Sequence, residues 1–488
     1  MLKASLQNKT FEKNLSGAVM ILSALLLFYT GWKAVVISFT HDESRSFNLF
    51  VPQNFMDIIS LKKPDANNHL LNTLFMKYSS MFFGNSEFAL RWHSVASHLI
   101  YILFTWLIVS RTSSALIAFS GFVLLNVNPF LLDYFSLARG YAMALAFISV
   151  SVYFIIRYVE SKRMKHVVFS LVFASLAALS GFSFLILYPA VVLVINLFWC
   201  SENKNFSASG LMKMNRVVIL VSLILGIICY EPVRRLIKFE CLYFGGETGF
   251  FHDTVVSVIN AVIQGQPYYN PAALALKIFI VASFLTMFVA ALSEFYFKKM
   301  SALQEKFVIA FLLLAFAFVI SEMQHFILGT RFLFHRTAIF FVPLFCLAFI
   351  FFISDFYAGE KLRVPGRLAL VIVASAFFIH TIFCLNVSSI SAWRFDSETK
   401  QMLGELERLS QREKPVPVRL GISWFFEPTV NFYRTTKKYS WLPKATRVDF
   451  RKAEYDYYYL SAEDFGFADS TNRHVIRNYA VSGNYLVK

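Results

Sequence analysis

The sequence predicts a polytopic α-helical membrane protein with a small α/β domain at its C-terminal end. Hydrophobic residues make up 57% of the 488 residues, charged residues only 16%, and the mean hydropathy is +0.56. A soluble chain of this length needs more charge to keep its surface hydrated. Apolar runs recur at close to the roughly 20 residues that cross a hydrocarbon core. The run 307–320, FVIAFLLLAFAFVI, carries no charge at all and should insert unaided.

The apolar runs predict about eleven transmembrane helices. We place them at residues 15–38, 93–110, 114–131, 138–157, 166–180, 183–199, 217–231, 273–293, 307–321, 337–355 and 367–388. Lysine and arginine gather in connectors such as 157–165 and 298–306, on the side of the N-terminus. Positive connectors are typical of the cytoplasmic side. The net charge of +16 therefore reports topology and does not indicate a nucleic-acid partner.

An odd number of spans places the C-terminus on the extracytoplasmic side of an inner or cytoplasmic membrane. Residues 1–390 should form the membrane domain, and residues 391–488, where the composition becomes that of a soluble protein, a separate α/β domain. We expect a helix over 395–409 and strands over 418–424, 456–460 and 474–481. The segment 39–92 should hold short helices at the membrane surface. Its residues Phe55, Met56, Ile58 and Ile59 are expected to face lipid.

Two acidic sites follow apolar runs and face the same side of the predicted membrane. Asp42 and Glu43 follow the first run, and Asp133 follows the third. Burial of a carboxylate is unfavourable, so carboxylates at the edge of a bilayer usually have a function that requires a charged group. The pair could act as a general base, as metal ligands, or as both. The alternative is an ordinary polar residue at a helix boundary.

Other polar residues lie on the same predicted face. Asn68 and His69 could donate hydrogen bonds to a polar substrate or a phosphate, or could simply cap a helix. Arg139 is close to Asp133, and the two could form an ion pair, or Arg139 could bind phosphate with its planar fork. Arg336 opens a span from this face, a position suited to a lipid phosphate. Its alternative is snorkelling to the interface.

Together these motifs resemble the GT-C glycosyltransferases, integral-membrane enzymes that use polyprenyl-phosphate sugars. Relatives include the protein O-mannosyltransferases and the bacterial transferase that adds aminoarabinose to lipid A. The resemblance covers roughly residues 1–390 and is strongest in the first 160. It is carried, in order, by Asp42-Glu43, the Asn-His stretch 67–69, the segment 83–91, Asp133 with 138–141, and 335–337.

The resemblance implies a hexosyl or pentosyl transferase that moves a sugar from a polyprenyl-phosphate donor to an acceptor on the extracytoplasmic face. The acceptor is an unspecified glycan, lipid or protein. The catalytic residues implied are Asp42, Glu43 and Asp133, with Asp42 as the base. Substrate binding falls to Asn68, His69, Arg139, Tyr141 and Arg336. Asp42 and Asp133 could hold a magnesium or manganese ion, although the phosphate leaving group makes a metal optional.

Two other functions fit a protein of this class. A transporter or flippase of a lipid-linked sugar also has many spans and buried charges. Transporters often show paired repeats and broken helices near the middle of the membrane. Here the charges gather at one face and no repeat is visible, which favours an enzyme. A non-catalytic receptor or assembly protein is the second alternative.

Overall fold

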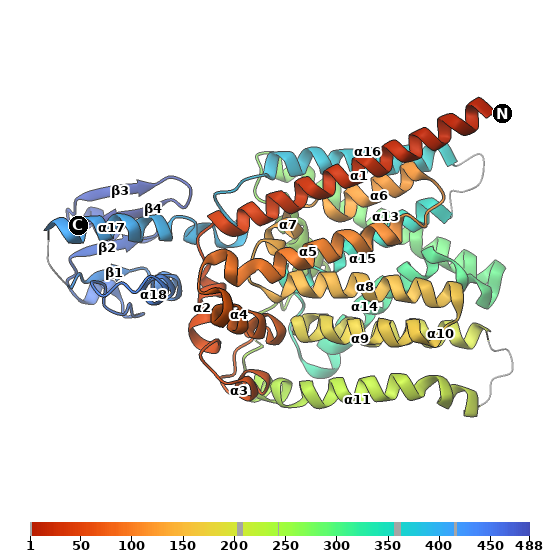
Figure 1. The fold of residues 1–488 in the computed structure, drawn as a ribbon, viewed down its shortest axis with the longest axis horizontal. Coiled ribbons are helices and arrows are strands. Elements are labelled where there is room, and N and C mark those ends of the chain that lie inside the picture. Colours follow the sequence, from red (N-terminus) through yellow and green to blue (C-terminus); the bar gives the residue numbers. More distant parts are fainter. Residues whose placement is uncertain (1, 203–207, 243, 356–362, 414–416) are drawn as a thin grey trace.

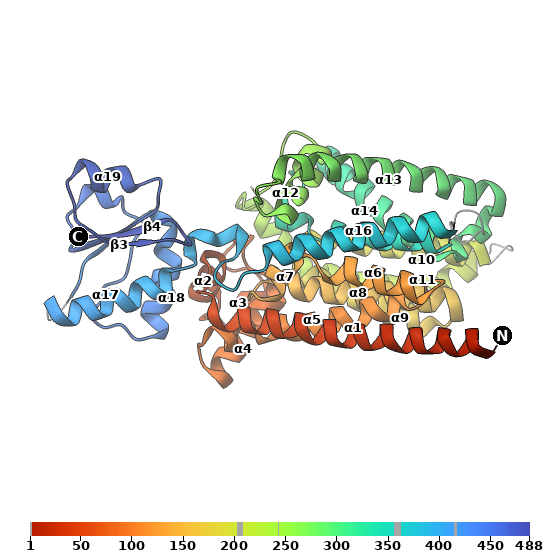
Figure 2. The ribbon, with the colours of Figure 1, turned by 90° about the horizontal axis from the view of Figure 1, so that it is seen from above.

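The chain forms a long bundle of helices with a small α/β domain beyond one end (Figure 1). The computed structural model describes all residues except 1, 203–207, 243, 356–362 and 414–416. Two perpendicular views show the N-terminus at the end of the bundle opposite to the α/β domain (Figures 1 and 2). The protein is a multi-pass integral membrane protein.

Within the described residues, nine helices are long and apolar enough to cross a membrane. They correspond to nine of the predicted spans: α1 (Leu2–Val36), α5 (Glu87–Val109), α8 (Gly140–Ser161), α10 (Leu187–Glu202) with the turn before it, α11 (Ala208–Lys238), α13 (Tyr269–Lys298), α14 (Lys306–Leu328), α15 (Phe341–Asp355) with the turn before it, and α16 (Arg363–Cys384). With these turns the two spans are Phe182–Glu202 and His335–Asp355. The predicted span 166–180 is α9 (Met164–Ser180), whose 17 residues make it shorter than any of these nine spans, the shortest of which has 21 residues.

The predicted span 114–131 is a broken helix. α6 (Ala115–Asn126) and α7 (Pro129–Phe135) meet at a bend of 62°. The side chain of Asn128 accepts hydrogen bonds from the first backbone N–H groups of α7, and Pro129 occupies the first turn. Proline is well tolerated there because its missing N–H has no partner to lose. The bend places α7 across the end of the bundle that faces the α/β domain (Figure 2).

Three short helices lie at the end of the bundle that faces the α/β domain: α2 (His41–Phe50), α3 (Phe55–Ile59) and α4 (Leu70–Phe83) (Figures 1 and 2). As expected, Phe55 and Met56 are exposed. The prediction for Ile58 was wrong, because this side chain is fully buried. Ile58 lies two residues after Met56, which is about 200° around a helix and therefore on the opposite face.

The C-terminal domain has a four-stranded sheet. Its order is β1 (Leu420–Ile422), β2 (Tyr457–Leu460), β4 (Asn484–Val487) and β3 (Val475–Tyr479), with β1 and β2 parallel and the other pairs antiparallel. Successive side chains of a strand point to opposite faces. Tyr457 and Tyr459 pack with α17 (Thr399–Glu413) and α18 (Glu427–Thr436), while Tyr458 and Leu460 pack with α19 (Phe465–Ser470). The sequence predicted three of these strands and missed β4.

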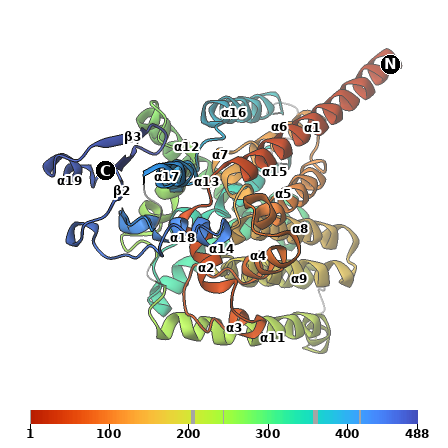
Figure 3. The ribbon, with the colours of Figure 1, turned by 60° about the vertical axis from the view of Figure 1, so that its left-hand side comes forward.

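The C-terminal domain docks on the bundle through α18 and α2 (Figure 3). The rings of Phe39 and Phe432 stack with their centroids 4.1 Å apart. The backbone N–H of Phe39 donates to the Tyr433 hydroxyl at 2.8 Å, and that hydroxyl donates to Glu87 at 3.1 Å. The domain is thus fixed directly above the segment that carries the acidic pair.

Candidate active site

Glu43 is the centre of a closed hydrogen-bond network at the start of α2. Its carboxylate accepts a two-pronged hydrogen bond from Arg91, at 2.8 and 2.6 Å, and both side chains are fully buried. It also accepts from the backbone and hydroxyl of Thr40, both at 2.9 Å, and from the Ala138 N–H at 2.6 Å. Glu43 therefore fastens α2 to α5 and to the segment between α7 and α8.

Arg91 extends this network to the end of α1. Its guanidinium also donates to the carbonyl oxygens of Ala34, Ile37 and Ser38. The last carbonyl groups of a helix have no partner within the helix. Arg91 satisfies them and neutralises Glu43 in the same place, so the exit from α1 and the start of α2 are held as one unit.

Asp42 makes different contacts from those of Glu43. Its Oδ2 lies 3.3 Å from Nη2 of Arg336 and 3.5 Å from Nη2 of Arg139. This oxygen accepts no hydrogen bond from the described residues. Burial of Asp42 opposes ionisation, but the positive charges of Arg139 and Arg336 outweigh burial and hold the pKa below its usual value. The carboxylate is therefore ionised at neutral pH.

Arg139, at the residue before α8, is positioned by His69. The Nδ1 atom of His69 lies 3.0 Å from the Ser180 carbonyl, and Nε2 lies 2.9 Å from Nη2 of Arg139. A carbonyl only accepts, so Nδ1 carries the hydrogen and Nε2 accepts from Arg139. Burial, followed by the charge of Arg139, keeps the pKa of His69 well below its usual value. The neutral ring thus aims the guanidinium at Asp42.

Gly140 allows this close arrangement. A Cβ atom at position 140 would lie 1.7 Å from the Ser180 carbonyl oxygen and 2.8 Å from Nδ1 of His69. The Ser180 backbone cannot give way by that amount without moving the end of α9. Glycine is therefore required at the start of α8 if Arg139 and His69 are to meet.

Arg336 belongs to the short turn His335–Ala338 that precedes α15. Its guanidinium lies over the ring of Phe244 at 4.3 Å and over the ring of Trp393 at 5.3 Å. Aromatic faces attract a cation and hold its plane. Trp393 lies in the turn Ser391–Asp396, which leads into the C-terminal domain. A residue from the far end of the chain therefore helps to hold Arg336 beside Asp42.

The remaining predicted binding residues differ in their closeness to Asp42. Tyr141 packs edge-on against His69, with ring centroids 4.9 Å apart, and borders the arginine pair. Asn68 instead accepts from the Thr73 hydroxyl at 2.7 Å and anchors α4. Its neighbour Asn67 donates to the Asp42 carbonyl at 2.8 Å. Asn67 thus contacts the Asp42 backbone, whereas Asn68 does not.

Asp133 pairs with a residue that the sequence analysis did not single out. Its Oδ1 lies 2.6 Å from Nζ of Lys33, a fully buried residue of α1. Its Oδ2 accepts hydrogen bonds from Gln264 and from the backbone of Ser391, each at 3.2 Å. The ion pair considered between Asp133 and Arg139 is not the one that forms, because Arg139 faces Asp42.

The residues around the two aspartates do not fit a divalent metal ion. Across the described ranges, no three His, Cys, Asp or Glu side chains gather where an ion could be held. Asp42 faces two guanidinium groups and Asp133 faces an ammonium group, so fixed cations already occupy the positions beside both carboxylates. We therefore assign no metal ligand at this centre.

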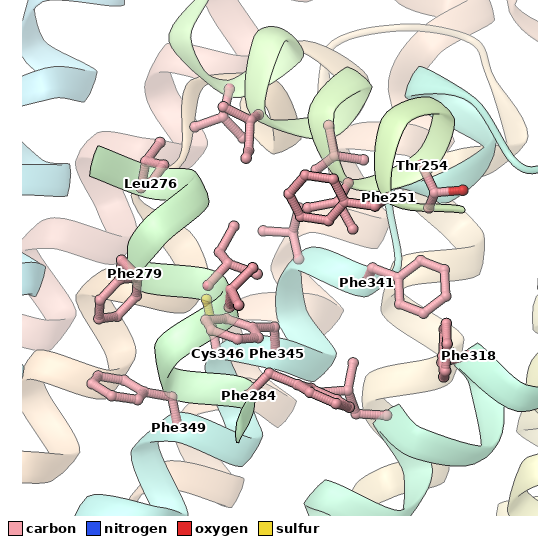
Figure 4. A pocket seen from close by; sticks show the side chains of 18 of the residues that line it. Phe251, Thr254, Leu276, Phe279, Phe284, Phe318, Phe341, Phe345, Cys346 and Phe349 are labelled. Carbon is pink, nitrogen blue, oxygen red and sulfur yellow. The ribbon is translucent and has the colours of Figure 1, made fainter. Parts of the chain in front are cut away.

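An apolar cavity of about 700 Å³ lies inside the bundle. Phenylalanine rings from several helices surround it, among them Phe279 of α13, Phe318 of α14 and Phe345 of α15 (Figure 4). Further walls come from the turn Phe250–Val256 and α12 (Ser257–Ile263). Phe341, the first residue of α15, lines the cavity and follows Arg336 by five residues in the chain.

The fold and the site define a membrane protein in which a buried charged centre lies between an apolar cavity and a small α/β domain. The family model described as dolichyl-phosphate-mannose-protein mannosyltransferase matches residues 67–228. No curated protein matches the sequence.

Two solved structures are similar over nearly the whole chain. ArnT from Cupriavidus metallidurans in the apo state is 12% identical, with a TM-score of 0.52, and the match covers 97% of this chain and 98% of that one. ArnT from the same organism bound to undecaprenyl phosphate is also 12% identical, with a TM-score of 0.51, covering 96% and 97%. The chain has the GT-C glycosyltransferase fold, and the resemblance predicted from the sequence is confirmed.

Proposed function

We propose that this protein is a glycosyltransferase that moves a sugar from a polyprenyl-phosphate donor to an acceptor on the extracytoplasmic face of the membrane. The observation that carries the proposal is the buried Asp42 carboxylate, whose Oδ2 lies between Arg139 and Arg336 and accepts no hydrogen bond from the residues that the structure describes. Two converging guanidinium groups form a binding site for an anion such as a phosphate. The similar ArnT structure that is bound to undecaprenyl phosphate supports a donor of this kind.

The transfer needs a base for the acceptor and charge stabilisation for the donor. In the proposed step, the acceptor hydroxyl oxygen attacks the anomeric carbon and gives its proton to Asp42. The bond between that carbon and the phosphate oxygen breaks, and the phosphate leaves with the electron pair. Arg139 and Arg336 stabilise the charge that develops on it, and fixed cations are most effective in a site that excludes water.

Donor binding should also make Asp42 a better base. In the free protein the two arginines hold its pKa low, which makes the carboxylate a weak base. A phosphate bound to both guanidinium groups brings negative charge beside Asp42 and offsets their pull, so the pKa of Asp42 rises. The base is then strongest when the donor is in place.

The apolar cavity is suited to the hydrocarbon tail of the donor. Its lining is almost entirely aliphatic and aromatic, and it includes Phe341, five residues after Arg336. Burying hydrocarbon there contributes about 25 cal/mol for each Å² removed from water. Arg139 and Arg336 would bind the phosphate of the donor, and the apolar cavity would bind its prenyl chain.

The other predicted site residues receive supporting roles in this proposal. Glu43 holds α2 in place through Arg91, and Asp133 holds α7 against α1 through Lys33. His69 orients Arg139, Tyr141 lines the site, and Asn68 anchors α4. Because the guanidinium groups supply positive charge, the transfer should proceed in the presence of a chelator of Mg²⁺ and Mn²⁺.

The proposal is tested with the purified full-length protein in lipid nanodiscs. Undecaprenyl-phosphate-linked sugars are supplied, and mass spectrometry follows loss of the sugar from the donor. Mass analysis of surface glycans and lipids from cells with and without the gene identifies the acceptor. Movement of an intact donor across the bilayer, with no cleavage, would instead indicate a flippase and overturn the proposal.

A further inference from the structure

A second cavity, of about 450 Å³, lies where the C-terminal domain meets the bundle. We propose that this junction pocket binds a sugar ring of the acceptor, so that the acceptor is a saccharide or a glycolipid headgroup. The inference rests on the proposed glycosyltransferase function and assigns its acceptor class. The pocket is lined by His41, Trp393, Phe395, Trp424, Phe425, Ser461, Ala462, Glu463, Ser482 and Asn484.

Aromatic rings form the apolar part of the pocket. Trp424 is 58% exposed although it lies in a well-packed part of the domain. Its edge contacts are with His41 and Phe425, at centroid distances of 6.5 and 5.7 Å, and the Arg447 guanidinium lies over the ring at 5.5 Å. The exposed fraction shows that much of the indole surface is still accessible. The face of an indole is electron-rich, and a sugar ring presents polarised C–H groups on its flat side. An exposed tryptophan beside polar groups therefore suits a pyranose better than a purely apolar ligand.

A buried acceptor atom points to a ligand that donates hydrogen bonds. Asn484 is 1% exposed, and its Nδ2 donates to the Phe395 carbonyl and to the Tyr459 hydroxyl, each at 2.7 Å. The carbonyl can only accept, so the amide orientation is determined and Oδ1 is left without a partner within the described residues. Such a buried acceptor without a partner is unfavourable, because it has lost its hydrogen bonds to water. A sugar hydroxyl would remove that cost.

His41 adds a second acceptor. Its Nδ1 lies 2.7 Å from the Phe425 carbonyl and must carry the hydrogen, which leaves Nε2 with a lone pair. Burial lowers the pKa of His41 and keeps the ring neutral. With the exposed carboxylate of Glu463, the pocket offers several acceptors beside its aromatic faces. This combination matches a ligand that carries many hydroxyl groups.

The pocket is connected to the reaction centre through shared residues. His41 directly precedes Asp42, and Trp393 both lines the pocket and lies over the Arg336 guanidinium. A sugar held between Trp424 and Trp393 would therefore present a hydroxyl towards the arginine-bound phosphate. Nine of the ten lining residues belong to the C-terminal domain and one, His41, to the membrane domain, so the proposal gives the C-terminal domain a role in selecting the acceptor.

Saturation-transfer NMR on the full-length protein in detergent tests the pocket directly. The probes are the methyl glycosides of glucose, galactose, mannose and N-acetylglucosamine. We expect at least one to receive saturation from the wild type. Trp424→Ala should weaken that binding about tenfold, since loss of an aromatic contact removes roughly 1.4 kcal/mol. Trp424→Phe should restore part of it, and Val475→Ala, an exposed residue of β3 outside the pocket, should not change it.

Transfer kinetics supply a second, independent readout. Trp424→Ala should raise KM for the acceptor about tenfold while KM for the donor changes less than twofold. The proposal is overturned if none of the glycosides binds the wild type, if Trp424→Ala binds and transfers like the wild type, or if a serine-containing peptide and no glycoside occupies the pocket. Glycoside binding that depends on Trp424 in a protein that cleaves no donor would instead overturn the glycosyltransferase function alone.

Discussion

Glu43 and Asp42 are neighbours on one helix, and each pairs with arginine, yet the two pairs are built differently. The Glu43–Arg91 pair is fully buried, with a distance of 2.6 Å and hydrogen bonds to both carboxylate oxygens. Asp42 approaches Arg139 and Arg336 only to 3.5 and 3.3 Å, and its Oδ2 accepts no hydrogen bond within the described residues. Both carboxylate oxygens of Glu43 therefore have hydrogen-bond partners, whereas Oδ2 of Asp42 can still accept a hydrogen bond.

The difference supports the structural role proposed for Glu43 and the chemical role proposed for Asp42. A buried ion pair with every oxygen satisfied resists rearrangement, because breaking it leaves an unpaired charge. A carboxylate oxygen that accepts no hydrogen bond, such as Oδ2 of Asp42, can gain a partner when a ligand arrives. Mutation of the Glu43–Arg91 pair should therefore lower stability, whereas mutation of Asp42 should slow sugar transfer.

Asp42→Asn should have the largest effect. Asparagine keeps the size of the side chain but cannot accept a proton, and loss of a general base slows a reaction about 10²- to 10⁴-fold. The measurement is single-turnover cleavage of the lipid-linked sugar. Undecaprenyl phosphate should still bind, because both arginines remain. A variant with full transfer would remove Asp42 from the mechanism.

Glu43→Gln should act on stability. It leaves Arg91 charged and buried without a counter-ion, which costs about 3–5 kcal/mol. We expect a lower melting temperature in detergent, with activity retained by the protein that stays folded below it. An unchanged melting temperature combined with lost transfer would place Glu43 in the chemistry after all.

Asp133→Asn extends the comparison to the third carboxylate. It leaves Lys33 buried without its counter-ion, so stability should fall by about 3 kcal/mol. The double variant Lys33→Met with Asp133→Leu removes both charges and should recover that loss. If the double variant is stable but inactive, Asp133 acts on the substrate and the supporting role proposed above is wrong.

Arg336→Ala should weaken donor use without changing the fold. Loss of hydrogen bonds to a charged group costs about 1.5–3 kcal/mol, which raises KM for the donor roughly 10- to 100-fold. Arg336→Lys should be intermediate, because lysine keeps the charge but loses the planar fork. Arg331→Ala is the matched control, since Arg331 pairs with the exposed Glu247. Equal effects at both positions would contradict a role for Arg336 at the phosphate.

The smallest effect concerns pH. The pKa of Asp42 in the free protein is lowered, so the base should stay deprotonated at the pH where an ordinary aspartate takes up a proton, and kcat/KM should stay level there. With donor bound, the pKa rises, and the acid limb of kcat should lie at higher pH than that of kcat/KM. Coincident limbs would show that the phosphate does not offset the arginines.

The helices could be predicted because hydrophobicity acts locally along the chain. Apolar runs gave the bundle, although the Asn128-Pro129 pair that bends α6 into α7 was passed over. The pattern Thr40-His41-Asp42-Glu43 also carries a readable capping signal. Read in that way, it would have indicated the capping contacts between Glu43 and Thr40 from the sequence alone.

The partners of the site residues could not be predicted in the same way. Lys33 is a single charge in an apolar run that still passes as a span, so nothing local marks it as the counter-ion of Asp133. Trp393 reaches Arg336 only after the C-terminal domain has docked. Contacts between positions so far apart in the chain depend on tertiary packing, which one sequence does not reveal.

The shared indole of Trp393 has a consequence for how two ligands communicate. The Trp393 ring lies against the Arg336 guanidinium beside the reaction centre, and the same ring also lines the junction pocket. A ligand bound at either site therefore changes the position of the Trp393 ring at the other site. Linkage is reciprocal, so each ligand must alter its counterpart's affinity by the same factor. A single side chain would thereby make the two binding events cooperative.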